Sequence, residues 1–147
     1  MSTASVSTAS GSTGPGSTGP VSTVLLAVAG AHLRDQPLHH QLADRGAEFV
    51  AATTTSADYR LFALSTVPPK PGVVRVAEGG AALEVEVYRL TEAAFGSFVA
   101  ALPQPMAIGS VTLADGSPVS GFLVEPIALA GAADITAHGG WRAYLAS

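Results

Sequence analysis

Hydrophobic and polar positions divide this chain into short strands separated by turns and a few short helices. Residues 24–29 are six consecutive apolar residues, too few for a free-standing helix and too uniformly apolar for a strand with one solvent face. They predict a strand that is buried on both faces. The small residues 30–33 predict a turn, and Asp35 with Pro37 predicts the start of a short helix that ends at Gly46.

The next strands are indicated by β-branched and aromatic residues. Residues 49–55 and 59–64 are rich in these types, and each segment predicts a strand. A Glu-Gly-Gly turn at residues 78–80 separates residues 73–77 from residues 81–90. We therefore expect these two segments to pair as a hairpin.

The strand predicted over residues 81–90 carries two carboxylates on one face, Glu84 and Glu86. Strand side chains alternate, so the two lie about 7 Å apart, which invites comparison with paired-carboxylate hydrolases. A solvated outer face explains the pair more simply, and we expect that face to be exposed. Either glutamate would become a candidate functional residue if its face of the strand lined the mouth of a barrel.

The second half of the chain predicts one amphipathic helix and a second hairpin. Thr91 can cap residues 92–102, whose apolar residues recur at helical spacing. Residues 108–113 and 119–124 flank an Ala-Asp-Gly-Ser turn and predict the hairpin. Together these elements indicate an α+β fold, a curved sheet or small, mostly antiparallel or mixed β-barrel with short helices.

Residues 1–23 differ in composition from the rest of the chain. They hold 7 Ser, 5 Thr, 4 Gly and 2 Pro but no charged residue, so they offer too little apolar surface to offset the entropy of ordering them. We expect a disordered tail or linker there and one folded domain over residues 24–147.

Charge and composition exclude several classes of function. The chain has 7 basic and 11 acidic residues, a net charge of −4 and no basic cluster, so we expect no nucleic-acid partner. It has no cysteine, no helical pair of histidines and no phosphate or dinucleotide loop, so we expect neither a metal nor a cofactor. The longest apolar run is too short for a membrane span, and we expect a soluble, cytoplasmic protein.

His32 is the leading candidate for chemistry. It follows a predicted buried strand, within a turn of small residues whose unpaired backbone N–H groups could bind an anion. Gly30, Ala31 and Leu33 would supply those groups, which makes this a place for a small carboxylate substrate. The alternative is that the His32 ring simply packs against the helix that follows.

The other histidines and the arginines are also candidates. His39 and His40 are adjacent, so they point about 100° apart on a helix, and we expect both on its surface. His138 lies beside two glycines in a segment that could close over a pocket, or it is an ordinary loop residue. The arginines that could hold a carboxylate with two hydrogen bonds include Arg34, Arg60 and Arg142. We take His138 and Arg142 as further substrate-binding candidates, although spacing does not decide between the arginines.

Five spaced blocks of sequence carry a family resemblance. They are, in order, VAGAHL with the PL that follows, GGAALEVEVYRL, AFG, GFLVE and DITAHGGWRAYL, and the match spans residues 24–146. The chain resembles the C-terminal domain of allophanate hydrolase. The resemblance implies a γ-glutamylcyclotransferase-like fold and the second step of allophanate breakdown, in which N-carboxycarbamate made by an amidase domain is decarboxylated.

Some positions depart from the family pattern. Asp35 and His39 stand where a glycine and an asparagine are expected, and His138 stands where phenylalanine is more typical. A negative charge at Asp35 would oppose a dianionic substrate if it faced the pocket. Cyclotransferases of this fold use a glutamate after the helix, whereas residues 102–105 contain no carboxylate.

The resemblance implies a stand-alone domain that decarboxylates N-carboxycarbamate, or a related small carboxylated intermediate of urea or allophanate degradation. His32 would act as the general acid that protonates the nitrogen as CO₂ leaves. A separate amidase protein is the implied partner, and a homodimer is a further expectation. The alternatives are a non-catalytic module that binds a small acid or docks onto an amidase, and a γ-glutamylcyclotransferase, against which the missing carboxylate argues.

Overall fold

The computed structural model describes residues 21–147, so most of the predicted disordered tail lies outside the described residues. The larger sheet has the strand order β2-β5-β1-β7-β6. Its strands are β1 (Thr23–Val28), β2 (Glu48–Thr54), β5 (Glu84–Thr91), β6 (Met106–Thr112) and β7 (Pro118–Val124). β1 therefore begins one residue inside the predicted tail.

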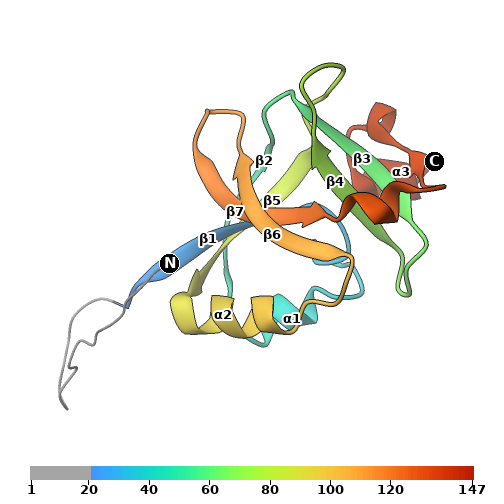
Figure 1. Ribbon diagram of the computed structural model, residues 1–147. Helices are drawn as coiled ribbons and strands as arrows, with labels where there is room; N and C mark the ends of the chain where they lie inside the picture. Colours follow the sequence, from blue (N-terminus) through green and yellow to red (C-terminus); the bar gives the residue numbers. More distant parts are fainter. Residues whose placement is uncertain (1–20) are drawn as a thin grey trace, which may run out of the picture.

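A smaller sheet and several short helices complete the fold. The smaller sheet has the order β4-β3-β8 and consists of β3 (Tyr59–Leu64), β4 (Lys70–Arg75) and β8 (Ala133–Asp134). The α-helices are α1 (His40–Ala43), α2 (Glu92–Ala100) and α3 (Trp141–Leu145), and the 3₁₀ helices are η1 (Pro126–Leu129) and η2 (Thr136–His138). In Figure 1, α1 and α2 lie together below the larger sheet, whereas α3 lies beside β3 and β4.

The α+β class is confirmed, but the predicted barrel is not closed. Over residues 21–147 the strands form two separate sheets. β1 pairs antiparallel with β5 and parallel with β7, and its residues Leu26, Ala27 and Val28 are consecutive and buried. This confirms a first strand with both faces covered, because side chains of consecutive residues point to opposite faces.

The hairpin predicted over residues 73–77 and 81–90 is wrong. β4 pairs with β3, whereas β5 pairs with β1 and β2, so the two arms belong to different sheets. The intervening turn carries the chain from one sheet to the other. Gly80 is needed there because a Cβ atom would lie 2.6 Å from the backbone of Asp58. Local alternation predicts a strand but not its partner.

The predicted helix start at Asp35 is also wrong. Asp35 has a left-handed backbone with φ of 68°, whereas a helix cap has extended backbone angles. Turns and bends fill the segment up to His39, and α1 is a single turn. Gly46, with φ of 72°, ends this segment as predicted.

The predictions for the second half are confirmed. The Thr91 hydroxyl accepts a hydrogen bond from the Ala94 N–H at 3.0 Å and caps α2. β6 and β7 form the expected antiparallel hairpin. Phe98 from α2 and Phe122 from β7 are both buried, and their rings meet edge to face with a centroid distance of 5.7 Å.

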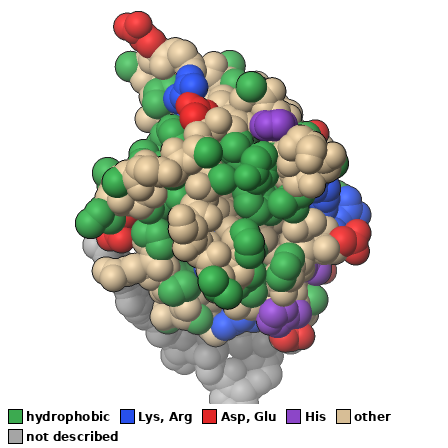
Figure 2. Space-filling view, turned by 90° about the vertical axis from the view of Figure 1, so that its right-hand side faces the viewer, with side chains coloured by type: hydrophobic (Ala, Val, Ile, Leu, Met, Phe, Trp, Pro, Cys, Tyr) green, Lys and Arg blue, Asp and Glu red, His purple; other side chains and the backbone are tan. Residues whose placement is uncertain are grey.

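Charged side chains are sparse on part of the surface. Figure 2 shows one face on which hydrophobic side chains gather centrally, with most charged groups near the outline. The exposed large hydrophobic side chains of the described residues include Val67 at 98% and Ile127 at 80%. No helix among residues 21–147 is long and apolar enough to cross a membrane.

Candidate functional site

The turn that leaves β1 forms the centre of the candidate site. Its shape is held by two backbone hydrogen bonds, from the Leu33 N–H to the Gly30 carbonyl at 3.0 Å and from the Leu38 N–H to the Ala31 carbonyl at 2.9 Å. The Leu33 donor is therefore already used inside the turn. The N–H groups of Ala31 and His32 make no backbone hydrogen bond within the described part of the chain.

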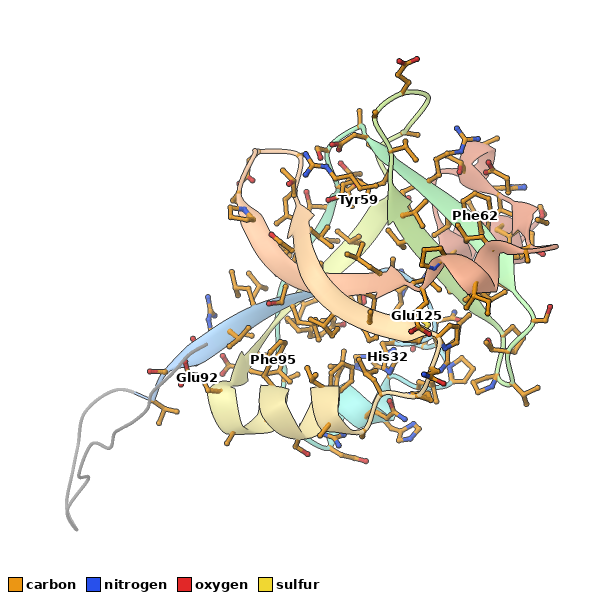
Figure 3. The ribbon with its side chains drawn as sticks, viewed as in Figure 1. His32, Tyr59, Phe62, Glu92, Phe95 and Glu125 are labelled. Carbon is orange, nitrogen blue, oxygen red and sulfur yellow. The ribbon has the colours of Figure 1, made fainter. Side chains whose placement is uncertain are left out.

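The His32 ring is buried between aromatic side chains. It is 6% exposed, stacks on Phe122 with a centroid distance of 5.0 Å and meets the edge of Phe98 at 5.2 Å. Figure 3 shows His32 between the helices and the larger sheet. Its Nε2 lies 2.7 Å from Gln41 Oε1. Because an amide oxygen only accepts, Nε2 carries the ring proton and Nδ1 has the free lone pair.

Burial also decides the charge of His32. Desolvation lowers the pKa of His32 to about 4, with a smaller lowering from the positive charge of Lys70. The hydrogen bond with Gln41 opposes these effects only in part. The ring is therefore neutral at pH 7 when the pocket is empty.

A small pocket with a cavity volume of about 20 Å³ opens beside this ring. Its lining combines the turn, one cation and an apolar wall: Ala29, Gly30, Ala31, His32, Lys70, Pro71, Val73, Met106 and Phe122. Lys70 is 9% exposed and takes part in no salt bridge among residues 21–147. A buried cation without a partner is costly, so this pocket suits an anion.

Lys70 was missed by the sequence analysis. It lies in a Pro-Pro-Lys-Pro-Gly segment that reads as a break between strands. The structure makes it the first residue of β4, opposite Leu64 in β3. Lys70 reaches the turn after β1 because β4 packs against that turn, with Pro71 beside Gly30, and no local pattern in the sequence shows this packing.

Gly30 allows the turn to approach β4 closely. A Cβ atom at this position would lie 2.2 Å from Pro71 Cδ and 2.4 Å from Pro71 Cγ. Any larger side chain would push β4 and the turn apart. Gly30 thus shapes one wall of the pocket as a candidate substrate-binding residue.

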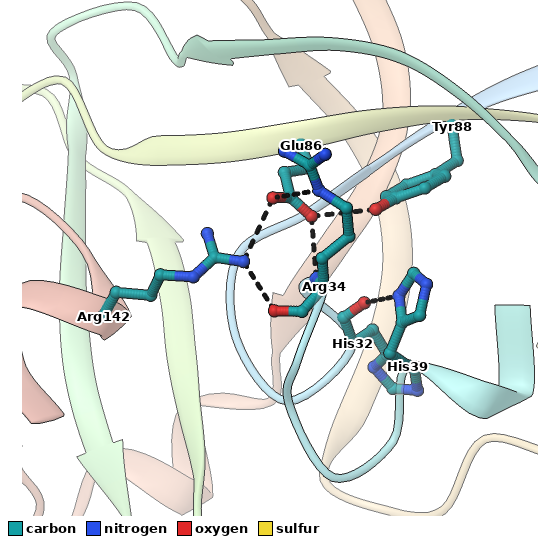
Figure 4. A network of polar contacts seen from close by, with 6 residues as sticks. All are labelled: His32, Arg34, His39, Glu86, Tyr88 and Arg142. Atoms are coloured by element: carbon teal, nitrogen blue, oxygen red, sulfur yellow. Dashed lines mark hydrogen bonds and ion pairs between the residues drawn. The ribbon is translucent and has the colours of Figure 1, made fainter.

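A second polar cluster lies on the other side of the turn, around Glu86. The expected solvent-exposed position of Glu86 is wrong, because the residue is 2% exposed. Figure 4 shows its carboxylate among Arg34, Tyr88 and Arg142. Oε1 accepts from the Arg34 backbone N–H and the Tyr88 hydroxyl, both at 2.9 Å. Oε2 accepts from Arg34 Nε at 3.3 Å and Arg142 Nη2 at 3.1 Å.

These contacts determine the protonation of Glu86 and Tyr88. Burial alone raises the pKa of Glu86, but hydrogen bonds from Arg34 and Tyr88 and the charge of Arg142 outweigh it and lower the pKa below its usual value. Burial and the neighbouring carboxylate raise the pKa of Tyr88. The pair is therefore a carboxylate that accepts from a neutral phenol.

The remaining candidates do not line the His32 pocket. Arg142 and Arg34 line a separate cleft of about 370 Å³ beside Glu86. His138 is exposed and packs against the Tyr144 ring at 5.4 Å. Arg60 pairs with Asp134, where hydrogen bonds from Thr136 and Arg60 lower the pKa of Asp134 to about 2.

The positions of the two adjacent histidines and of Asp35 test further predictions from the sequence. His40 is exposed as predicted, whereas His39 precedes α1, is half-buried and donates from Nδ1 to the His32 carbonyl at 2.9 Å. Asp35 is exposed and does not line the His32 pocket. Among the described residues there is no cluster of three or more potential metal ligands.

Comparisons with known proteins agree with the sequence blocks. A family model described as the allophanate hydrolase C-terminal domain matches residues 24–146. Urea amidolyase of Saccharomyces cerevisiae is 42% identical over 127 residues, which are 83% of this chain and 7% of that protein. The crystal structure of Kluyveromyces lactis allophanate hydrolase has a TM-score of 0.82 at 42% identity and covers 85% of this chain and 21% of that one.

A further solved structure is of similar size. The structure of c4763, a uropathogenic E. coli-specific protein, has a TM-score of 0.80 at 38% identity, with 85% of this chain and 97% of that chain covered. A mouse AIG2-like protein, 19% identical with a TM-score of 0.54, shares the fold alone. The structural neighbours thus include γ-glutamylcyclotransferase-like folds.

Proposed function

We propose, from the premise that this chain belongs to the allophanate hydrolase C-terminal domain family, that its His32 pocket binds N-carboxycarbamate or a closely related small dicarboxylate and promotes loss of CO₂. The observation that carries the proposal is Lys70, a buried cation that lines the same pocket as His32 and has no salt bridge within residues 21–147.

The pocket supports binding of a small carboxylate through charge and backbone donors. The Lys70 ammonium supplies the attraction, and the N–H groups of Ala31 and His32 supply hydrogen bonds. Gly30 lets the turn lie close against Pro71 of β4, which also lines the pocket. Arg142 and His138 do not line this pocket. We keep them as proposed substrate-binding residues only if their side chains move toward the pocket.

The chemistry follows from the same groups. When the N–C bond of N-carboxycarbamate breaks, CO₂ leaves and the nitrogen of the remaining carbamate needs one proton. A bound dianion raises the pKa of a neighbouring imidazole, so His32 gains a proton on binding and can donate it to that nitrogen. The apolar wall of Val73, Met106 and Phe122 favours neutral CO₂ over a carboxylate.

The setting of this reaction is also part of the proposal. The chain spans 7% of the length of the yeast urea amidolyase it matches, so the activity of that whole protein is not assigned to this chain. We infer that a separate amidase supplies the N-carboxycarbamate and that the domain acts on it during allophanate breakdown. A homodimer stays an untested prediction.

The test is CO₂ release from N-carboxycarbamate generated by a purified amidase acting on allophanate. The parent chain should accelerate release above the uncatalysed rate, and His32→Asn should lower that acceleration by about 10²-fold or more. Lys70→Met should lower it by at least about tenfold through weaker binding. Arg89→Met is the control, because Arg89 is half-exposed on β5 and away from the pocket. Equal acceleration by all four proteins would contradict the proposal.

A second candidate function is docking onto an amidase without catalysis. The surface in Figure 2, with its central hydrophobic side chains and few charges, favours this alternative. A stable complex with the amidase and an unchanged rate of CO₂ release would support docking. Formation of 5-oxoproline from γ-glutamyl substrates would instead support a cyclotransferase, which we do not expect because residues 102–105 lack a carboxylate.

A further inference from the structure

We infer that Glu86 is a positioning residue, which holds the turn after β1 in the form that presents the Ala31 and His32 N–H groups to the pocket. This inference rests on the proposed function of that pocket. Glu86 does not line the pocket itself, so it acts through the turn and not by touching a ligand.

Glu86 holds the chain on both sides of the turn. Its backbone is in register with Val28, the last residue of β1, just before the turn begins. Its side chain accepts the Arg34 N–H at 2.9 Å, where the turn ends. Because β5 is paired with β2 on its other side, opposite Ala52, the position of Glu86 is itself fixed by two neighbouring strands.

The middle of the turn is reached through Tyr88. The His32 carbonyl accepts from His39 Nδ1, and the His39 ring packs against Tyr88 with a centroid distance of 5.6 Å. The Tyr88 hydroxyl donates to Glu86 Oε1 at 2.9 Å. The peptide that carries the His32 carbonyl is thus supported by a chain of contacts that ends on the same carboxylate (Figure 4).

The C-terminal helix joins the same support. Arg142 Nη2 donates to Glu86 Oε2 at 3.1 Å and to the Arg34 carbonyl at 2.6 Å. With donors from Arg34, Tyr88 and Arg142, the carboxylate has four hydrogen bonds. A carboxylate with all these partners is held rigidly, as a positioning group requires.

The experiment compares Glu86→Gln, Glu86→Asp and a matched control, Glu84→Gln, which changes an exposed glutamate two residues away on the same strand. The first readout is the amide nitrogen and proton chemical shifts of Ala31 and His32 in the ligand-free protein. The second is the dissociation constant of malonate, a stable dicarboxylate. The shifts need no catalysis and no ligand, so they test the positioning separately from the proposed function.

We expect Glu86→Gln to move both amide shifts and to weaken malonate binding about tenfold, because one donor group replaces an acceptor. Glu86→Asp should behave similarly, since it keeps the charge but loses the reach to Arg34. Glu84→Gln should match the parent. Unchanged shifts in Glu86→Gln, or full recovery by Glu86→Asp, would overturn the inference.

Two other outcomes are covered by the same design. If Glu86→Gln does not fold, Tyr88→Phe removes a single donor and keeps the carboxylate. It should shift the His32 amide and weaken malonate binding by a few-fold, and a result equal to the parent would overturn the inference. If the parent does not bind malonate, the proposed ligand class fails while the amide shifts still decide the role of Glu86.

Discussion

The two sides of the turn after β1 handle a buried charge in opposite ways. On one side Lys70, 9% exposed, has no salt bridge within the described residues. On the other side Glu86, 2% exposed, accepts four hydrogen bonds. Burial of a charge is compensated only by partners, so the Glu86 side is complete as it stands, whereas under the proposed function an anionic ligand would complete the Lys70 side.

The largest effect on stability should come from removing the Glu86 carboxylate. Glu86→Leu removes a buried acceptor and leaves the Arg34 N–H and the Tyr88 hydroxyl without their partner. We expect the free energy of unfolding to fall by about 4 kcal/mol. Urea denaturation measures it, with Glu84→Leu as the exposed control. A loss under about 1 kcal/mol would show that the cluster is not a structural unit.

The second effect is a dependence of stability on pH that comes from His32. Its pKa of about 4 in the folded protein lies below 6.5 in the unfolded chain, so the unfolded state binds more protons between these values. Stability should therefore fall by about 3 kcal/mol as the pH drops from 7 to 4. The free energy of unfolding of His32→Asn, measured by denaturation across this pH range, should lack this pH dependence. The exposed control His40→Asn should keep it.

The third effect sharpens the role of close packing in the pocket. Gly30→Ala would place a Cβ 2.2 Å from Pro71 Cδ. We therefore expect the free energy of unfolding to fall by about 2 kcal/mol and malonate binding to weaken. Gly96→Ala is the control, because no atom beyond its chain neighbours and the nearby backbone of α2 lies within 4 Å of its Cβ position. It should stabilise by about 1 kcal/mol. A stable Gly30→Ala protein with normal binding would contradict this account of the wall.

The smallest effect should come from Lys70 in the absence of ligand. Lys70→Met keeps the apolar stem and removes a charge that has no salt bridge within the described residues. The free energy of unfolding should therefore change by less than about 1 kcal/mol. Malonate should raise the melting temperature of the parent but not of Lys70→Met. Strong destabilisation by Lys70→Met would mean that the charge supports the fold, and the contrast with Glu86 would be lost.

Much of the fold could be predicted because it depends on local patterns. β3 has the predicted bounds, Thr91 caps α2, and β6 and β7 form a hairpin across a short turn. The error in the first hairpin concerned the choice of partner strands. The first arm pairs with β3, the strand just before it in the chain, whereas the second arm pairs with the more distant β1 and β2. Alternation of side chains identifies neither partner.

By itself, the sequence determined that a histidine follows a buried strand in a turn of small residues, since apolar runs and glycines act over a few positions. Only the tertiary structure decided that Lys70 shares a pocket with that histidine and that Glu86 is buried behind it. The pairing of β5 with β1 brings Glu86 to the turn, and the packing of β4 against the turn, where Gly30 meets Pro71, brings Lys70 there. Their opposite surroundings follow from which side chains meet there, and a linear pattern does not contain that information.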